Sequence, residues 1–369
     1  MSASSDEFFE GKRPWSKIKD EILKNYLVPY LAKVNKRGQP ILLIDGYAGP
    51  GIYEDGSCGS PIILCEEAER LAKSNYHAIF VNNKKKYHNT LTREIQQRGW
   101  SRLAEARLGD TQLVLREIPP MLKGQTLFLY LDPFGPKGCD FNLLSPFLKR
   151  DTRFSTEILL TMNMTGMHRL AGRHADNAER ENIKSNRLIL TQTFGGDYWR
   201  EILLPDDIQR EVREMQLIDA YRKKLSHAFE YTCACPVKAG TGKRIKYFVV
   251  LVSHHSDALI LLNDIMVKAY GAGMHRLDFT GKLWEHIDWR EMRSINGFDL
   301  DHIVLNTISK HPGKTREFIW LRIIEEHFMQ YLKSEYIHAV KQLVDARKLT
   351  FSSKTNRLND ESVLRPYNL

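Results

Sequence analysis

The sequence predicts an α/β protein built on a mostly parallel, Rossmann-like sheet with a C-terminal antiparallel hairpin, followed by a winged-helix module. Three observations predict this fold class. Short apolar strands alternate with helices as far as Asn163, a pattern typical of crossover units and of a parallel sheet covered on both faces. Each of these strands ends in a small or polar cluster. Residues 298–369 instead show three helices and a turn-rich end.

Composition and charge narrow the class of protein. The chain has 369 residues, of which 42% are hydrophobic and 27% charged; this balance excludes a disordered, collagen-like or coiled-coil chain. No apolar run approaches the roughly 20 residues of a membrane helix, and the N-terminus lacks the apolar core of a signal peptide, so we expect a cytoplasmic protein without a membrane partner. The net charge of +9 is spread along the chain, which fits a nucleic-acid partner or a mildly basic surface without one.

The first part of the chain reads as strand and helix in turn. Helical spacing predicts a first helix over residues 18–31, and Ser60-Pro61 has the character of an N-cap and first-turn pair that opens a second helix. Gly109-Asp110 opens a further helix that ends near Pro119. The predicted strands are residues 41–45, 78–81, 104–108, 127–132 and 157–163.

A helical insertion and a hairpin complete the first predicted domain. Residues from about 164 to 228 are polar and helix-prone, and the segments 230–237 and 246–252 read as two strands joined by AGTGKR. A helix over 256–270 and a linker follow. We therefore predict a first domain over residues 1–297 and a second over residues 298–369.

The second domain has the pattern of a winged helix, a variant of helix-turn-helix. Helical periodicity covers 300–308, 315–328 and 334–346, and a wing is expected from about Lys348 to Leu358. Such modules bind nucleic acid or dock proteins. If this one binds nucleic acid, basic side chains on the third helix and wing would contact phosphates; the candidates are Lys333, Lys341, Lys348, Lys354 and Arg357.

The segment IDGYAGPG, residues 44–51, places glycines in the turn that follows the first strand. It is neither a dinucleotide GxGxxG followed directly by its helix nor a phosphate-binding P-loop. An acidic residue at a strand end followed by small residues suits S-adenosylmethionine: Asp45 would meet the methionine ammonium directly or through water, and Gly46, Gly49 and Gly51 would make room for it. A tight turn with no ligand is the alternative.

The next two strand ends offer polar groups for the rest of that cofactor. Asn82 stands where an acidic side chain usually binds the ribose hydroxyls, and an amide can still hydrogen-bond a hydroxyl, without charge assistance. Asp110 is a candidate for the adenine amino group, and it is equally placed to cap the helix that begins at Thr111.

The segment DPFG, residues 132–135, provides the catalytic candidates. It resembles the DPPY type of motif in amino-directed methyltransferases, in which the acid holds the target nitrogen and the aromatic ring stacks on a flipped base. Asp132, Pro133 and Phe134 would take these roles, although one proline of that motif is missing. A purely structural strand-end carboxylate is the alternative. The histidines and the five cysteines have no metal-ligand spacing, so we expect no metal.

Taken together, these motifs resemble those of the three-Cys-motif partner proteins (TcmP family). The likeness rests on IKDEILKNYLVPYL near the N-terminus, on IDGYAGPG with the trailing GSPI, on LDPFGPKG, on FGGDYW and on YFVVLVSHHSDALILLNDIMVKA. The resemblance implies a class I methyltransferase-like domain and a radical-SAM-like partner protein with three cysteines.

Two hypotheses about function follow. The first is an S-adenosylmethionine-dependent methyltransferase that acts on nucleic acid, with or without the three-Cys partner. The second is a catalytically inactive, Rossmann-like subunit that binds nucleic acid, motivated by Asn82 and the altered DPPY-type motif.

Overall fold

The computed structural model describes residues 14–135, 138, 140–172, 181–205, 208–238, 244–277 and 299–367. The chain divides into two compact units, Met1–His255 and Ser256–Leu369, and each is described by itself. The domain boundary expected between residues 297 and 298 lies outside the described residues. Within the described part of the chain, no helix is long and apolar enough to cross a membrane.

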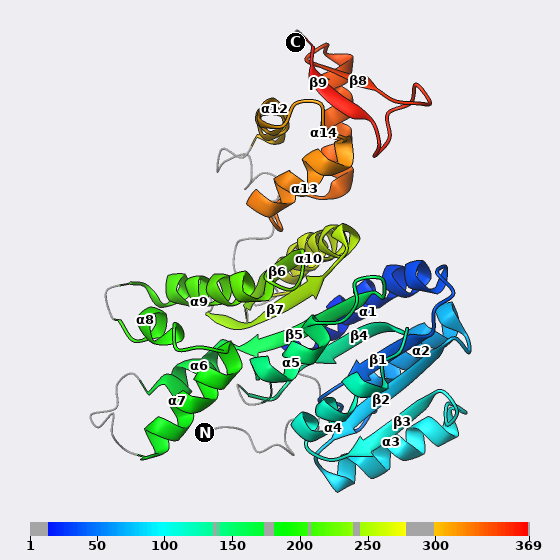
Figure 1. Cartoon of the computed structure of the whole chain (residues 1–369), viewed down its shortest axis with the longest axis vertical. Coiled ribbons are helices and arrows are strands. Elements are labelled where there is room, and N and C mark those ends of the chain that lie inside the picture. The colour runs from blue at the N-terminus through cyan, green and yellow to red at the C-terminus, as the bar shows by residue number, and fades with distance from the viewer. Residues whose placement is uncertain are drawn as a thin grey trace. The chain divides into compact units, whose positions relative to one another are not determined.

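Unit 1 is built on a seven-stranded sheet (Figure 1) with the order β3-β2-β1-β4-β5-β7-β6. Strands β1 to β5 pair in parallel, and β7 is antiparallel to both of its neighbours, β5 and β6. This order, with one reversed strand in the sixth place, is that of a class I methyltransferase-type sheet, so the predicted fold class and its antiparallel hairpin are confirmed. The strands are β1 Ile41–Asp45, β2 Tyr76–Asn82, β3 Ala104–Leu108, β4 Thr126–Leu131, β5 Thr156–Asn163, β6 Tyr231–Lys238 and β7 Ile245–Ser253.

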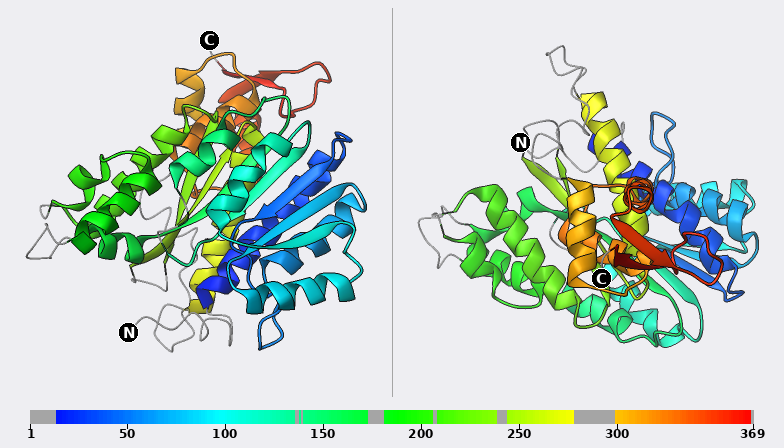
Figure 2. Two further views of the ribbon diagram at one scale, coloured as in Figure 1. Left: turned by 60° about the horizontal axis from the view of Figure 1, so that its bottom comes forward. Right: turned by 90° about the horizontal axis from the view of Figure 1, so that it is seen from above.

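Helices cover both faces of this sheet, which is why the central strands are buried along their whole length (Figure 2). On one face, Phe128 of β4 stacks on Tyr26 of the first helix with ring centroids 5.9 Å apart. On the other, alternate strand residues pack against the fourth and fifth helices in one continuous apolar core. The helices are α1 Pro14–Asn35, α2 Ser60–Ala72, α3 Lys85–Gln97, α4 Thr111–Glu117, α5 Phe141–Leu148, α6 Met164–Ala171, α7 Glu181–Phe194, α8 Trp199–Leu203 and α9 Arg210–Leu225.

Residues 299–367, within unit 2, contain three helices followed by two strands, where the sequence predicts three helices and a wing. Strands β8 and β9 form an antiparallel pair, and Thr315, just before the second of the three helices, makes a further antiparallel bridge to Val363 of β9. Trp320 stacks on Tyr336 inside this unit at 4.9 Å. Its identification as a winged helix remains a prediction. The elements are α10 Ser256–Leu277, α12 Leu300–Lys310, α13 Arg316–Glu326, α14 Lys333–Asp345, β8 Leu349–Ser352 and β9 Val363–Pro366.

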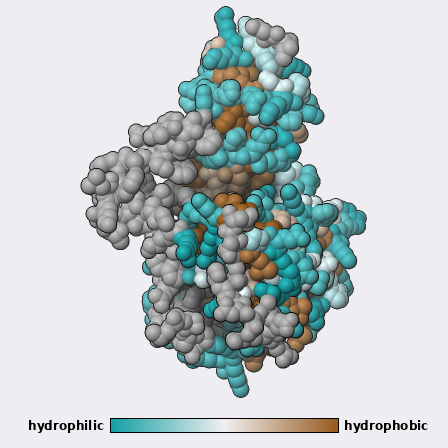
Figure 3. Space-filling model, turned by 90° about the vertical axis from the view of Figure 1, so that its left-hand side faces the viewer, coloured by the Kyte–Doolittle hydropathy of each residue, from teal (hydrophilic) through white to brown (hydrophobic). Residues whose placement is uncertain are grey.

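The visible surface of the described residues is largely hydrophilic, with hydrophobic residues in small areas (Figure 3). Phe134 is one of the large apolar side chains that are exposed, with 57% of it accessible to solvent. It lies three residues after the carboxyl end of β4.

Candidate functional site

Four neighbouring parallel strands bring the sequence-predicted residues of unit 1 to one edge of the sheet. Asp45 ends β1, Asn82 ends β2, and Asp110 and Asp132 follow β3 and β4. The register places Asp45 between Phe80 and Tyr130 of the adjacent strands. Because the carboxyl ends of parallel strands share an edge, and ligands in open α/β sheets bind there, this edge is the candidate site.

Asp45 shapes the turn that follows β1. Its side chain is completely buried. One carboxylate oxygen accepts a hydrogen bond from the backbone N–H of Tyr47 at 2.9 Å, and the other accepts one from the hydroxyl of Ser60 at 2.6 Å. Burial raises the pKa of Asp45 to about 7, with the nearby carboxylates of Asp132 and Asp20 adding to the rise and the two hydrogen bonds opposing it. A contact of Asp45 with a cofactor ammonium stays a prediction.

Close packing leaves little room for a side chain at Gly46 and Gly51 of the turn. A Cβ on Gly46 would lie 2.6 Å from Cδ2 of Leu131, and Gly51 has a φ of +85° with Leu91 only 2.9 Å from where its Cβ would be. The backbone of the turn is therefore pressed against β4 on one side and α3 on the other. The carbonyl of Gly49 accepts a hydrogen bond from the side-chain amide of Asn82 at 3.4 Å.

Asn82 thus connects the turn to the end of β2. Its side chain is 3% exposed, and its Oδ1 accepts no hydrogen bond from the residues that the structure describes. Asp110 is exposed and is the N-cap of α4: its carboxylate accepts a hydrogen bond from the backbone N–H of Gln112 at 2.7 Å. The capping role considered for Asp110 is confirmed, and a contact with adenine stays a prediction.

Asp132 is held by two side chains that sequence analysis did not identify. Nζ of Lys19, on α1, lies 2.6 Å from Oδ2, and the hydroxyl of Thr161, on β5, donates to Oδ1. The Lys19 ammonium also lies 5.3 Å from the ring centroid of Tyr247. Pro133, the second residue of the motif, is buried. The catalytic roles of Asp132, Pro133 and Phe134 stay predictions.

The N-cap of α2 differs from the sequence prediction, which placed it at Ser60. Gly59, and not Ser60, is the N-cap of α2, so Ser60 and Pro61 occupy the first two helical positions. The hydroxyl of Ser60 binds Asp45 instead of the helix N-terminus. A capping pattern of Ser followed by Pro cannot distinguish these cases, because it contains no information about a carboxylate 15 positions earlier.

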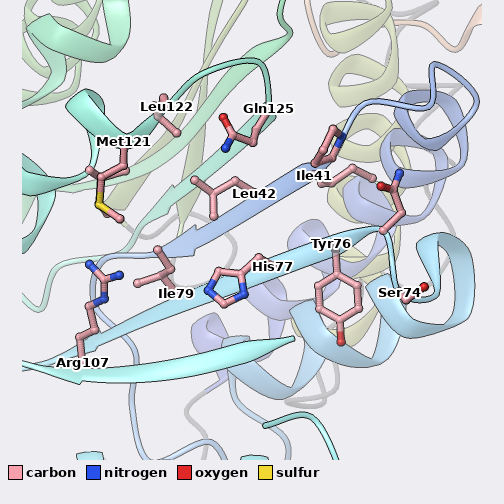
Figure 4. A pocket seen from close by; sticks show the side chains of 13 residues that line it. Ile41, Leu42, Ser74, Tyr76, His77, Ile79, Arg107, Met121, Leu122 and Gln125 are labelled. Atoms are coloured by element: carbon pink, nitrogen blue, oxygen red, sulfur yellow. The ribbon is translucent and has the colours of Figure 1, made fainter. Parts of the chain in front are cut away.

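A pocket of about 450 Å³ lies at the opposite, amino-terminal ends of the strands (Figure 4). It is formed by the first residues of β1 and β2 together with the segment between α4 and β4. None of the site residues predicted from the sequence lines it. Its polar groups are largely engaged: Arg107, for example, binds Glu105 through two nitrogens. The lining residues are Pro40, Ile41, Leu42, Ser74, Asn75, Tyr76, His77, Ile79, Arg107, Ile118, Met121, Leu122 and Gln125.

The predicted phosphate contacts of unit 2 differ in their surroundings. Nζ of Lys333 lies 2.8 Å from Asp360, which also binds Arg316 at 2.8 Å, so Lys333 is engaged within the unit. Lys341 and Lys348 are exposed, as are Lys354 and Arg357 in the segment between β8 and β9. Phosphate binding by all five side chains stays a prediction.

The strand order and the turn after β1 define a class I methyltransferase-type domain. No family model matches the chain, and no curated protein matches it. Similar solved structures include a methyltransferase from Geobacter sulfurreducens, with 13% identity, a TM-score of 0.28 and coverage of 61% of this chain and 76% of that one. A human methyltransferase 10 domain containing protein has 8% identity, a TM-score of 0.32 and coverage of 63% and 83%. A geranyl diphosphate methyltransferase in complex with SAM has 11% identity, a TM-score of 0.27 and coverage of 58% and 77%.

Proposed function

We propose that unit 1 binds S-adenosylmethionine at the carboxyl edge of its sheet and transfers the methyl group to an amino nitrogen of nucleic acid. The observation that carries this proposal is the turn between Asp45 and Gly51, packed against β4 and joined to the end of β2 by Asn82. In a sheet of this order, that turn lies where strand order reverses, which is the position at which such folds bind nucleosides.

The residues present fit this cofactor. The side-chain N–H of the buried Asn82 donates to the carbonyl of Gly49, and its Oδ1 would accept a hydrogen bond from a ribose hydroxyl. Backbone groups of Gly46, Gly49 and Gly51 would line the methionine end, and Asp110, exposed at the start of α4, would face the adenine. When bound, the cofactor supplies a methyl group activated by its sulfonium.

Asp132 would accept a hydrogen bond from the acceptor's amino group and hold its nitrogen in line with the methyl group. Catalysis would then come mainly from alignment and from the exclusion of water. Phe134, exposed beside it, would stack on the acceptor base. Unit 2 would supply the phosphate contacts through Lys341, Lys348, Lys354 and Arg357. Lys333 would contribute less to phosphate binding, because its ammonium is paired with Asp360.

The resemblance to the three-Cys-motif partner proteins adds a partner to the proposal, a radical-SAM-like protein. The second candidate function, an inactive subunit that binds nucleic acid, is favoured by one observation: both carboxylate oxygens of Asp132 are occupied, by Lys19 and by Thr161. In that case unit 1 would be a structural support for nucleic-acid binding.

Isothermal titration with S-adenosylmethionine tests the cofactor. We expect the wild type to bind it and Asn82→Ala to bind about tenfold more weakly, as the loss of one hydrogen bond to a hydroxyl implies. The matched control is Asn83→Ala, the exposed neighbour, which should bind as the wild type does. No heat of binding at millimolar cofactor would overturn the proposal.

Transfer of a radioactive methyl group to DNA or RNA tests the reaction, with the chain alone and with the three-Cys protein added. Labelled polynucleotide that disappears in Asp132→Ala supports the methyltransferase. Binding of polynucleotide that is unchanged in Asp132→Ala, with no label transferred under either condition, supports the inactive subunit.

A further inference from the structure

Lys19 occupies an unusual position for a lysine near the start of a helix. Such side chains normally extend their ammonium into water, whereas Lys19 is 15% exposed and turns its Nζ toward Asp132, itself 22% exposed. The ion pair joins residues 113 positions apart. Lys24, one and a half turns further along α1, shows the ordinary arrangement, because it is 60% exposed and lies 3.7 Å from Glu67.

The surroundings of the Lys19 ammonium are suited to a cation. Asp132 contacts it directly, and the face of Tyr247 lies 5.3 Å away, within the range of a cation–π interaction. Asp20 and Asp132 both act on Tyr247, whose pKa is raised by burial first and by these two carboxylates second. Withdrawal of the ammonium would leave a partly buried carboxylate without its counter-charge, which is costly unless another donor replaces it.

The Lys19 amine makes the contact with Asp132 that the proposed function assigns to an acceptor; the ring beside it is that of Tyr247. It is an amino nitrogen that donates to Asp132 beside an aromatic ring, at the end of β4, where the acceptor nitrogen would have to lie. We propose that Lys19 is an internal occupant of the acceptor subsite, and that an amine acceptor enters by exchange with its ammonium. This inference rests on the proposed function, which it deepens by assigning the subsite to primary amino groups.

Exchange of the Lys19 ammonium for an acceptor amine does not alter the methyl-transfer reaction. The neutral acceptor amine would attack the methyl carbon of the sulfonium cofactor, the carbon–sulfur bond would break, and S-adenosylhomocysteine would leave. The proton lost from nitrogen would pass to water, and Asp132 would hold the nitrogen throughout. The Lys19 side chain, once displaced, would reach solvent from the second turn of α1.

The test uses n-propylammonium, a fragment of the lysine side chain, as the probe. We expect Lys19→Ala to bind it at least about tenfold more tightly than the wild type does, since removal of a partly buried ion-pair partner leaves the carboxylate unpaired. Lys24→Ala is the matched control and should bind the probe as the wild type does. Adding Asp132→Asn to Lys19→Ala should abolish the gain.

A second measurement asks whether the bound amine lies beside the methyl group. Lys19→Ala with labelled S-adenosylmethionine and n-propylamine at pH 9, where more of the amine is neutral, should form N-methylpropylamine, and the wild type should form much less. If Lys19→Ala does not fold, Lys19→Gln, which keeps the stem and removes the charge, should still bind the probe more tightly than the wild type.

Equal probe binding in the wild type and both Lys19 variants would overturn the inference, as would binding of cofactor and probe without transfer. These outcomes are distinct from failure of the proposed function, because probe binding does not require the cofactor. Absence of S-adenosylmethionine binding in every variant would remove the function and leave only the amine subsite.

Discussion

Glu157 is a carboxylic acid buried between α1 and the sheet, and its replacement by glutamine gives a quantitative test of the packing of α1. The side chain is 4% exposed. It accepts a hydrogen bond from the hydroxyl of Tyr26, on α1, and another from Ser253, on β7, at 3.3 Å. Burial raises the pKa of Glu157 from 4.5 to about 7, with both hydrogen bonds opposing the rise.

The sign of the effect on stability follows from proton linkage. Between pH 4.5 and about 7 the carboxyl group of Glu157 is protonated in the folded chain and ionised in the unfolded chain. The stabilisation that this proton gives to the folded chain is therefore complete below pH 4.5 and is lost as the pH rises through 7. A rise of the pKa from 4.5 to about 7 corresponds to about 3 kcal/mol, at about 1.36 kcal/mol per pKa unit.

Glu157→Gln has no such proton, and its amide oxygen still accepts from Tyr26. We expect the free energy of unfolding of Glu157→Gln, relative to the wild type, to increase by about 3 kcal/mol between pH 4.5 and pH 8. Urea denaturation followed by circular dichroism at the two pH values measures it. Taking the difference between variant and wild type cancels Asp45, whose pKa is raised in the same range. A difference that stays constant within about 0.5 kcal/mol would refute the reasoning.

Two further predictions concern the turn and the basic segment of unit 2. Gly46→Ala should lower the free energy of unfolding by about 1–3 kcal/mol, because its Cβ would lie 2.6 Å from Leu131, whereas Gly135→Ala, with no atom within 4 Å, should have little effect in the same urea titration. Lys354→Ala combined with Arg357→Ala should weaken nucleic-acid binding and reduce its salt slope by roughly one unit per lost contact, whereas Lys333→Ala, paired with Asp360, should reduce the slope less. An unchanged slope in the double variant would indicate a solvated segment on a docking module.

The order of strands and helices was predictable from sequence because each element carries a local signal. The strand at 41–45 is a short apolar run after a proline, and it is found within those bounds as β1. The strand at 78–81 is found longer, as Tyr76–Asn82, because pairing with β1 extends its start and pairing with β3 extends its end. The placement of β7 between β5 and β6 carries no local signal, since it depends on which strand edges meet.

The candidate site was predictable only in part, for the same reason. Strand-end residues such as Asp45 and Asn82 could be assigned to one edge because parallel strands share an edge. The partners of Asp132 could not, because Lys19 belongs to a helix 113 residues earlier, and Thr161 lies within an apolar strand. Tertiary packing, and not spacing in the sequence, brings these three side chains together.

A crystal structure of the protein soaked with S-adenosylmethionine tests the central claim most directly. The account predicts a nucleoside at the carboxyl edge of the sheet, against the turn of residues 45–51, with a ribose hydroxyl donating to Oδ1 of Asn82. A nucleoside bound elsewhere, as in the pocket at the amino-terminal ends of β1 and β2, or none at saturating cofactor, would contradict it.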